Sequence, residues 1–136
     1  MSIAIRYYSK SGNTKKLAEA ISEAIGIEAK DVSEKLKEDV DILFIGNSVY
    51  WAGIDDAVKD FLKDPGAKIN KVVNFSTAAF IKSSYAQMTK ICEELNLSLS
   101  EEEFHCKGQF KMFNKGKPDE TDLEAAKTFA KKIVAE

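Results

Sequence analysis

The sequence is poor in the residues that build metal centres and disulfide frameworks. Among its 136 residues there are one histidine and two cysteines, and Cys92 and Cys106 stand in no CxxC or other metal-ligand spacing. We therefore expect no metal site and two reduced, half-buried thiols. The sequence also has only seven glycines and two prolines, which argues against a low-complexity or disordered chain.

An excess of charge of one sign and long hydrophobic runs are lacking as well. The net charge is only -2, whereas proteins that bind nucleic acid usually concentrate an excess of basic charge. No apolar run approaches the ~20 residues needed to span a bilayer, and the N-terminus lacks the basic, apolar and small-residue succession of a signal peptide. These absences predict a soluble cytoplasmic protein with no nucleic-acid or membrane partner.

The chain does contain enough apolar residues for a core, and their pattern alternates regularly. Hydrophobic residues make up 44% of the sequence, and its length suits one domain that spans residues 1–136. Short apolar runs predict strands at residues 3–8, 27–32, 40–46, 71–76 and 103–106. Helical spacing predicts helices that end at Gly26, cover residues 56–63, begin at a Ser84–Gln87 capping box and begin at a Thr121–Glu124 capping box. This alternation is typical of the α/β class, with a parallel sheet covered by helices on both faces.

Small polar residues are concentrated directly after the first predicted strand, in the run Ser9-Lys10-Ser11-Gly12-Asn13-Thr14. In an open parallel sheet, ligands bind beyond the carboxyl ends of the strands. A turn that leads into a helix offers unpaired N–H groups and the positive end of the helix dipole to an anion. Ordinary helix capping is the alternative, but six such residues in a row favour a phosphate site.

This run resembles the phosphate loop of the flavodoxins, in which Ser or Thr, any residue, Ser or Thr, Gly, any residue and Thr hold the phosphate of FMN. Neither GxGxxG nor GxxxxGK[ST] is present. The resemblance implies a flavodoxin-like three-layer sandwich of the short-chain type, with a five-stranded parallel sheet in the order 2-1-3-4-5. It also implies that hydroxyls and backbone N–H groups hold the phosphate, with Lys10 at a variable position.

A second segment follows the central predicted strand and resembles the loop that wraps the isoalloxazine ring in flavodoxin-like proteins. By that likeness the ring would be lined by Ser48, Val49, Tyr50, Trp51, Ala52 and Gly53. In flavodoxins a peptide of this loop flips to bond the reduced flavin, and Gly53 is the candidate here because glycine tolerates unusual dihedrals. The sequence Ala52-Gly53-Ile54 departs from the family, whose members place glycine beside aspartate. Coverage of the core by Trp51 is the alternative interpretation.

A third segment follows the fourth predicted strand and comprises Ser76, Thr77, Ala78, Ala79 and Phe80. A simple strand-to-helix turn is the alternative, but the family places this loop at the pyrimidine side of the ring. Phe80 or Tyr85 would then supply a second aromatic wall.

Two further features carry weaker expectations. Adjacent residues of a strand face opposite ways, so His105 and Cys106 are not expected to form a catalytic pair. The segment with Lys107, Lys111, Lys115 and Lys117 has Phe110 and Phe113 interleaved, and we interpret it as a solvated loop in preference to a docking surface.

The resemblance implies an FMN-binding electron-transfer protein that docks transiently with a reductase and an acceptor, as a monomer or weak dimer. The flavin supplies the chemistry, so no side chain needs to act as a catalytic acid or base. Asp55 and Asp56 would lower the potential of the flavin if they lie close to it. The alternatives are an FMN-dependent NAD(P)H:quinone-type oxidoreductase of the same fold and a flavin-free binding module.

Overall fold

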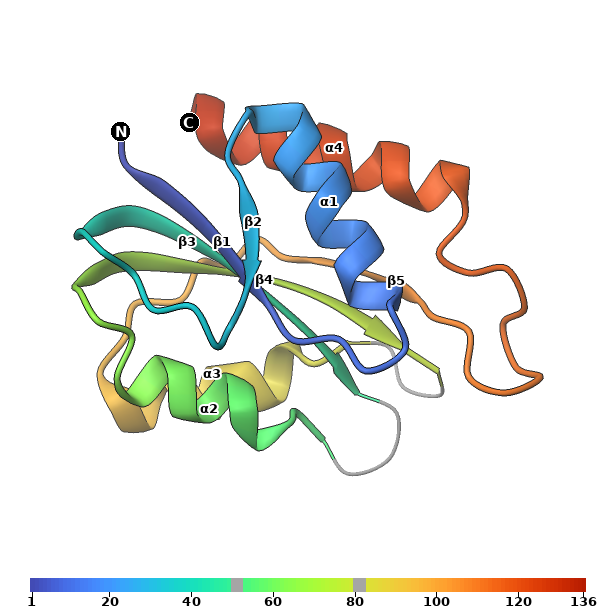
Figure 1. Cartoon of the computed structure of the whole chain (residues 1–136), viewed down its shortest axis with the longest axis horizontal. Coiled ribbons are helices and arrows are strands. Elements are labelled where there is room, and N and C mark those ends of the chain that lie inside the picture. Colours follow the sequence, from blue (N-terminus) through green and yellow to red (C-terminus); the bar gives the residue numbers. More distant parts are fainter. Residues whose placement is uncertain (50–52, 80–82) are drawn as a thin grey trace.

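The computed structural model describes residues 1–49, 53–79 and 83–136. Its strands form one parallel sheet in the order β2-β1-β3-β4-β5 (Figure 1). This arrangement confirms the predicted fold and strand order. The elements in chain order are β1 (Ile3–Tyr7), α1 (Asn13–Ile25), β2 (Ala29–Asp31), β3 (Val40–Val49), α2 (Asp56–Lys63), β4 (Ile69–Ala78), α3 (Tyr85–Leu95), β5 (Phe104–Lys107) and α4 (Glu120–Ala135).

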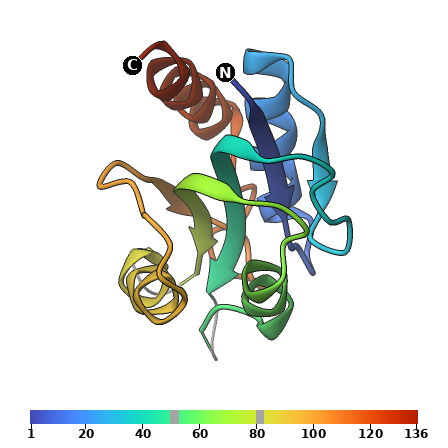
Figure 2. The same ribbon diagram turned by 90° about the vertical axis from the view of Figure 1, so that its left-hand side faces the viewer.

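Helices cover both faces of the sheet, with α1 and α4 on one side and α2 and α3 on the other (Figures 1 and 2). Alternate residues of the buried strands supply the two halves of the core, because successive side chains of a strand point to opposite faces. Phe44 and Phe75 pack under α1 and α4, whereas Leu43 and Val72 pack under α2 and α3. The central strands are therefore apolar on both faces, as expected for a buried parallel sheet.

The central strands extend further than their apolar runs predict. β3 continues to Val49 and β4 to Ala78, and these two residues are paired in the register. The prediction that Ser48 and Val49 lie in a loop is therefore wrong, and so is the same prediction for Thr77 and Ala78. Polar residues remain in strand conformation here because neighbouring strands satisfy their backbone groups and buried partners satisfy several of their side chains.

Two predicted capping boxes are also wrong. The N-cap of α4 is Asp119, whose carboxylate accepts from the backbone N–H of Asp122, while the carboxylate of Asp122 accepts from the backbone N–H of Asp119. Ser84 stands at the N-cap of α3 but makes no capping hydrogen bond with its side chain. The expected ranges of α2 and the end of α1 at Gly26 are confirmed. Across the described residues, no helix is both long and apolar enough to traverse a bilayer.

Candidate functional site

Thr14 joins three elements at the carboxyl ends of the strands. It lies in the first turn of α1 and is fully buried. Its hydroxyl lies 3.0 Å from the hydroxyl of Thr77 on β4 and 3.2 Å from the carbonyl oxygen of Asn47 on β3, to which it donates. The structure therefore brings Thr14 and Thr77 together, as expected for one site. The hydroxyl of Thr14 faces the sheet, so this residue anchors the turn that precedes α1.

The turn before α1 is shaped by its own glycine and serine. The hydroxyl of Ser9 accepts a hydrogen bond of 3.0 Å from the N–H of Gly12. Gly12 has φ +92°, a conformation that strongly favours glycine. It occupies the N-cap of α1, where it has no side chain to cap the helix, and the first turn contains no acidic residue. Ser11 is exposed beside it. This turn therefore combines a helix N-terminus, a free hydroxyl and no nearby first-turn carboxylate, which is the donor set that suits a phosphate.

The connection between β3 and α2 approaches the same turn. Asp55 caps α2 by accepting from the N–H of Ala57 at 2.9 Å, and its second oxygen lies 3.8 Å from the ammonium of Lys10. Two segments that are distant in sequence, 9–14 and 53–55, thus meet at one edge of the sheet. Asp56 begins the helix and is exposed.

Gly53 lies against Gln87 of α3, a residue that was predicted to take part in a capping box. Its φ is +88°, and a Cβ added to it would lie 2.5 Å from Oε1 of Gln87. The same Oε1 accepts from the N–H of Ile54 at 2.9 Å. Gln87 on α3 therefore positions the backbone that follows the second predicted site segment. Within that segment Ser48 is half-buried and Val49 belongs to the core, whereas Tyr50, Trp51 and Ala52 lie outside the described residues.

The third predicted segment is mostly strand. Ser76, Thr77 and Ala78 belong to β4 and are buried, as is Ala79 after them, and Phe80 lies outside the described residues. The hydroxyl of Tyr85 donates to the carbonyl of Ser100 at 2.8 Å, which directs this ring toward the segment that leads into β5. Burial raises the pKa of this phenol.

A chain of buried amides and hydroxyls lies beneath the site, on the face covered by α2 and α3. Asn47 donates to Oδ1 of Asn74 at 2.7 Å, and Asn74 donates to the hydroxyl of Ser84 at 3.0 Å. Oδ1 of Asn47 is buried and has no hydrogen-bond partner among the residues that the structure describes. An unmet acceptor of this kind costs about 1–3 kcal/mol, so native proteins contain few of them. This network fixes the carboxyl ends of β3 and β4 relative to the start of α3.

Beside this network lies a second polar cluster. The hydroxyl of Ser83 donates to Glu103, whose other oxygen lies 2.5 Å from Nδ1 of His105. Cys106 packs in the core on the α1 and α4 side, whereas Nδ1 of His105 bonds Glu103, so the two side chains face different ways along β5.

The segment between β5 and α4, which was not predicted to belong to the site, is hydrogen-bonded to it. The side-chain amide of Asn13 donates to the carbonyl of Gln109 at 2.9 Å. The side-chain amide of Asn114 donates to the carbonyl of Ala79 at 2.9 Å. A positive φ favours asparagine over most residues, and Asn114 has φ +53°, but sequence alone does not identify its distant partner.

Known proteins agree with this architecture. The chain matches the flavodoxin domain family over residues 4–115. It is 30% identical to an uncharacterized protein of Methanocaldococcus jannaschii, in an alignment that covers 90% of each chain.

Solved structures show the same fold. The chain is similar to a flavodoxin from the domain Archaea, with a TM-score of 0.77, 16% identity and coverage of 99% of this chain and 97% of that one. For flavodoxin 1 of Bacillus cereus the TM-score is 0.73 at 17% identity, with coverage of 100% and 99%. Rubredoxin oxygen:oxidoreductase of Desulfovibrio gigas also matches with a TM-score of 0.73 at 17% identity, over 98% of this chain but 35% of that one.

Proposed function

This chain belongs to the flavodoxin family, whose cofactor is FMN, and we propose that it uses the flavin to carry electrons between transient redox partners. The observation that carries the proposal is the turn Ser9–Thr14, which opens α1 without a side-chain cap and is anchored to β3 and β4 through Thr14. When bound, FMN supplies the redox chemistry, and the protein contributes binding, orientation and electrostatics.

The groups that this turn offers are hydrogen-bond donors suited to a phosphate. Backbone N–H groups of the first helical turn and the positive end of the dipole of α1 favour an anion. The exposed hydroxyl of Ser11 and the ammonium of Lys10 lie on the same turn. Thr14 holds the turn against the sheet, so its contribution is to orient these donors.

The charges beside the turn bear on the potential of the flavin. Asp55 and Asp56 would disfavour added negative charge on a nearby ring and so lower its potential. Lys10 lies 3.8 Å from the carboxylate of Asp55 and offsets part of this effect. No side chain is assigned a catalytic acid or base role, because electron transfer through the flavin does not require one.

Titration of FMN into the flavin-free protein tests the binding step, with quenching of FMN fluorescence as the readout. We expect Ser11→Ala to weaken binding roughly tenfold to a hundredfold, because a hydrogen bond to a charged group contributes about 1.5–3 kcal/mol. Ser98→Ala is the matched control, since Ser98 is exposed and its carbonyl bonds Val72, well before the carboxyl end of β4. Equal affinities for the two variants, or no quenching by the unmodified protein, would contradict the proposed site.

A second measurement tests the carrier role. Anaerobic NAD(P)H is added to the flavin-loaded protein and the flavin absorbance is followed. We expect no bleaching until a separate reductase is supplied, and a potentiometric titration is expected to resolve two one-electron steps. Rapid bleaching by NAD(P)H alone would instead identify a reductase of the same fold.

A further inference from the structure

The β5–α4 loop, residues 108–119, has a sharply folded tip. The backbone N–H of Phe110 donates to the carbonyl of Phe113 at 3.0 Å, and the N–H of Phe113 donates back at 2.9 Å. Between them Lys111 has φ +55°. A left-handed conformation is uncommon for a residue with a long side chain and costs on the order of 1 kcal/mol. Such a conformation persists only where the surrounding structure maintains it.

The loop is built onto the candidate flavin site. The N–H of Gly108 donates to the carbonyl of Ala78 at 3.1 Å, directly after β5. The carbonyl of Gln109 accepts from Asn13 in the first turn of α1, and Asn114 donates to the carbonyl of Ala79. These bonds fasten the base of the loop, on both sides of the folded tip, to the turn Ser9–Thr14 and to the end of β4, beside the candidate flavin site.

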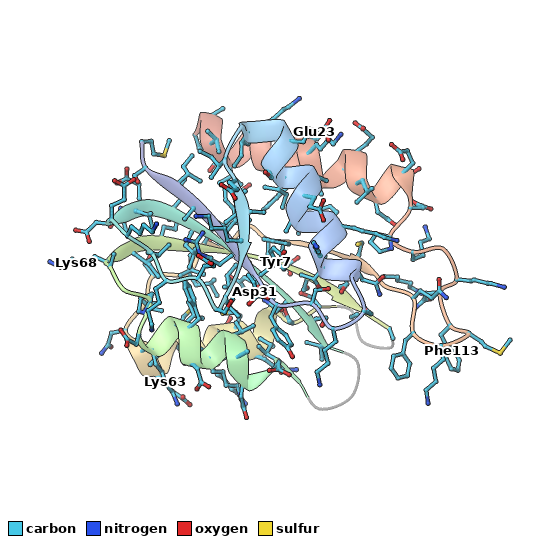
Figure 3. The ribbon with its side chains drawn as sticks, in the orientation of Figure 1. Tyr7, Glu23, Asp31, Lys63, Lys68 and Phe113 are labelled. Carbon is cyan, nitrogen blue, oxygen red and sulfur yellow. The ribbon has the colours of Figure 1, made fainter. Side chains whose placement is uncertain are left out.

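The tip presents apolar side chains to water. Met112 is 89% exposed and Phe113 is 55% exposed, and apart from Met1 no other large hydrophobic residue is exposed in the described part of the chain. Figure 3 shows Phe113 and Lys68 toward opposite ends of the molecule. Apart from Met1, the exposed large apolar side chains of the described residues thus lie on the loop beside the candidate flavin site.

Lysines surround this apolar tip. Residues 108–119 include three lysines and one carboxylate, that of Asp119, and Lys107 directly precedes them, although the whole chain carries a net charge of -2. Lys117 is paired with Asp119 at 2.7 Å. Across the described residues, no carboxylate comes within ion-pair distance of Lys107, Lys111 or Lys115. The loop and Lys107 therefore carry a local excess of positive charge, whereas the whole chain has a net negative charge.

We propose that the β5–α4 loop is the docking surface for a redox protein with an acidic surface. An apolar centre with a charged rim is the usual anatomy of a transient protein interface, and the rim charges control the rate of encounter. One electron passes from the reduced flavin to the partner, so the flavin is oxidised by one electron and the partner is reduced by one. The inference rests on the proposed function and adds the chemical class of the partner.

An anionic membrane is the alternative partner for a surface made of lysines and apolar residues. Stable membrane attachment needs more apolar area than two side chains provide, since even a single myristoyl chain binds only marginally. The side chains of Met112 and Phe113 alone provide less apolar area than a myristoyl chain, and the loop adjoins the candidate flavin site. A protein partner is therefore favoured.

Electron transfer to two proteins of opposite charge tests the proposal. The chemically reduced, FMN-loaded protein is mixed at low ionic strength with plastocyanin, an acidic copper protein, or with the basic cytochrome c, each of which accepts one electron. The net charge of -2 predicts faster reaction with cytochrome c, whereas the loop predicts faster reaction with plastocyanin. The plastocyanin rate is expected to fall as salt is added, because screening weakens the attraction.

Two charge reversals make the matched comparison. Lys111→Glu and Lys68→Glu change the net charge equally, but Lys68 lies at the opposite end of the molecule (Figure 3). We expect Lys111→Glu to slow the plastocyanin reaction severalfold at low salt, and the triple reversal of Lys107, Lys111 and Lys115 to slow it roughly tenfold or more. Lys68→Glu is expected to have little effect. Equal rates for the two single variants would overturn the proposal.

A binding measurement separates this proposal from the flavin assignment. Copper(I) plastocyanin is titrated into the ¹⁵N-labelled, flavin-free protein, and the backbone amide shifts are followed by NMR. Docking is expected to move amides of residues 107–117, and Met112→Ser is expected to weaken it. If FMN does not bind, the kinetic experiment fails but these shifts persist. Shifts elsewhere only, or binding to vesicles of anionic phospholipid without binding to plastocyanin, would overturn the docking surface.

Discussion

Gly46 on β3 lies opposite Phe75 on β4, and its lack of a side chain is a packing requirement. A Cβ added at Gly46 would lie 2.4 Å from two carbons of the Phe75 ring and 3.0 Å from Cγ2 of Thr14. Ordinary contacts between carbon atoms lie at about 3.5–4.0 Å. Phe75 is fully buried, so its ring has no solvent into which it can move. Gly46→Ala must therefore displace a packed ring by about 1 Å.

The cost of this displacement can be set in relation to the stability of a domain of this size. Overpacking of a core costs typically 1–3 kcal/mol, and a clash of this depth on the central strands belongs at about 3 kcal/mol. With about 2.1 cal/mol/K of unfolding entropy per residue, that loss lowers the melting temperature by about 10 °C. It moves the urea midpoint by roughly 1.5 M if the slope is about 2 kcal/mol/M.

Urea unfolding of four proteins tests this reasoning: the unmodified chain, Gly46→Ala, Phe75→Leu and the double variant. Phe75→Leu removes the ring that the new methyl group meets, so the two changes are expected to couple by more than about 1 kcal/mol. Because Thr14 also lies against Gly46, we expect Gly46→Ala to weaken FMN binding as well. An unchanged urea midpoint for Gly46→Ala, or strictly additive losses in the double variant, would refute the packing account.

Three further predictions follow from polar groups elsewhere. Burial raises the pKa of Cys92 to about 11 and that of Cys106 to about 12, so labelling by DTNB at pH 8 is expected to be roughly a hundredfold or more slower than for free cysteine. The hydrogen bond from Lys117 lowers the pKa of Asp119, so the stability that its charge contributes is present above its ordinary pKa and is lost as the pH falls through the lowered value. The difference in melting temperature between Asp119→Asn and the unmodified chain should accordingly shrink toward pH 3. Gln87→Leu is expected to accelerate hydrogen exchange at the backbone amide of Ile54, whose acceptor it removes. Gln87→Glu keeps an acceptor and should preserve the protection of that amide.

The sequence was least informative about which hydrogen-bond partner each polar side chain takes. Ser84 and Gln87 have the spacing of a capping box, yet Ser84 accepts from Asn74 and Gln87 accepts from the N–H of Ile54. Asp119 and Asp122 form the box that was assigned two residues later. A local pattern specifies which groups are able to bond, but several partners of similar energy compete for each group. The packing of elements that are distant in sequence decides among them.

The sequence by itself determined the class of the fold, the ends of α2 and the polar turn after β1. Those features depend on local propensity and on hydrophobic periodicity, which a linear pattern records directly. Only the tertiary structure decided that the hydroxyl of Thr14 faces the sheet, that Val49 belongs to the core and that Asn114 fastens the β5–α4 loop beside the site. Each of these outcomes depends on which residues of other elements come within hydrogen-bonding or packing distance, and that proximity exists only once the sheet and its helices have assembled.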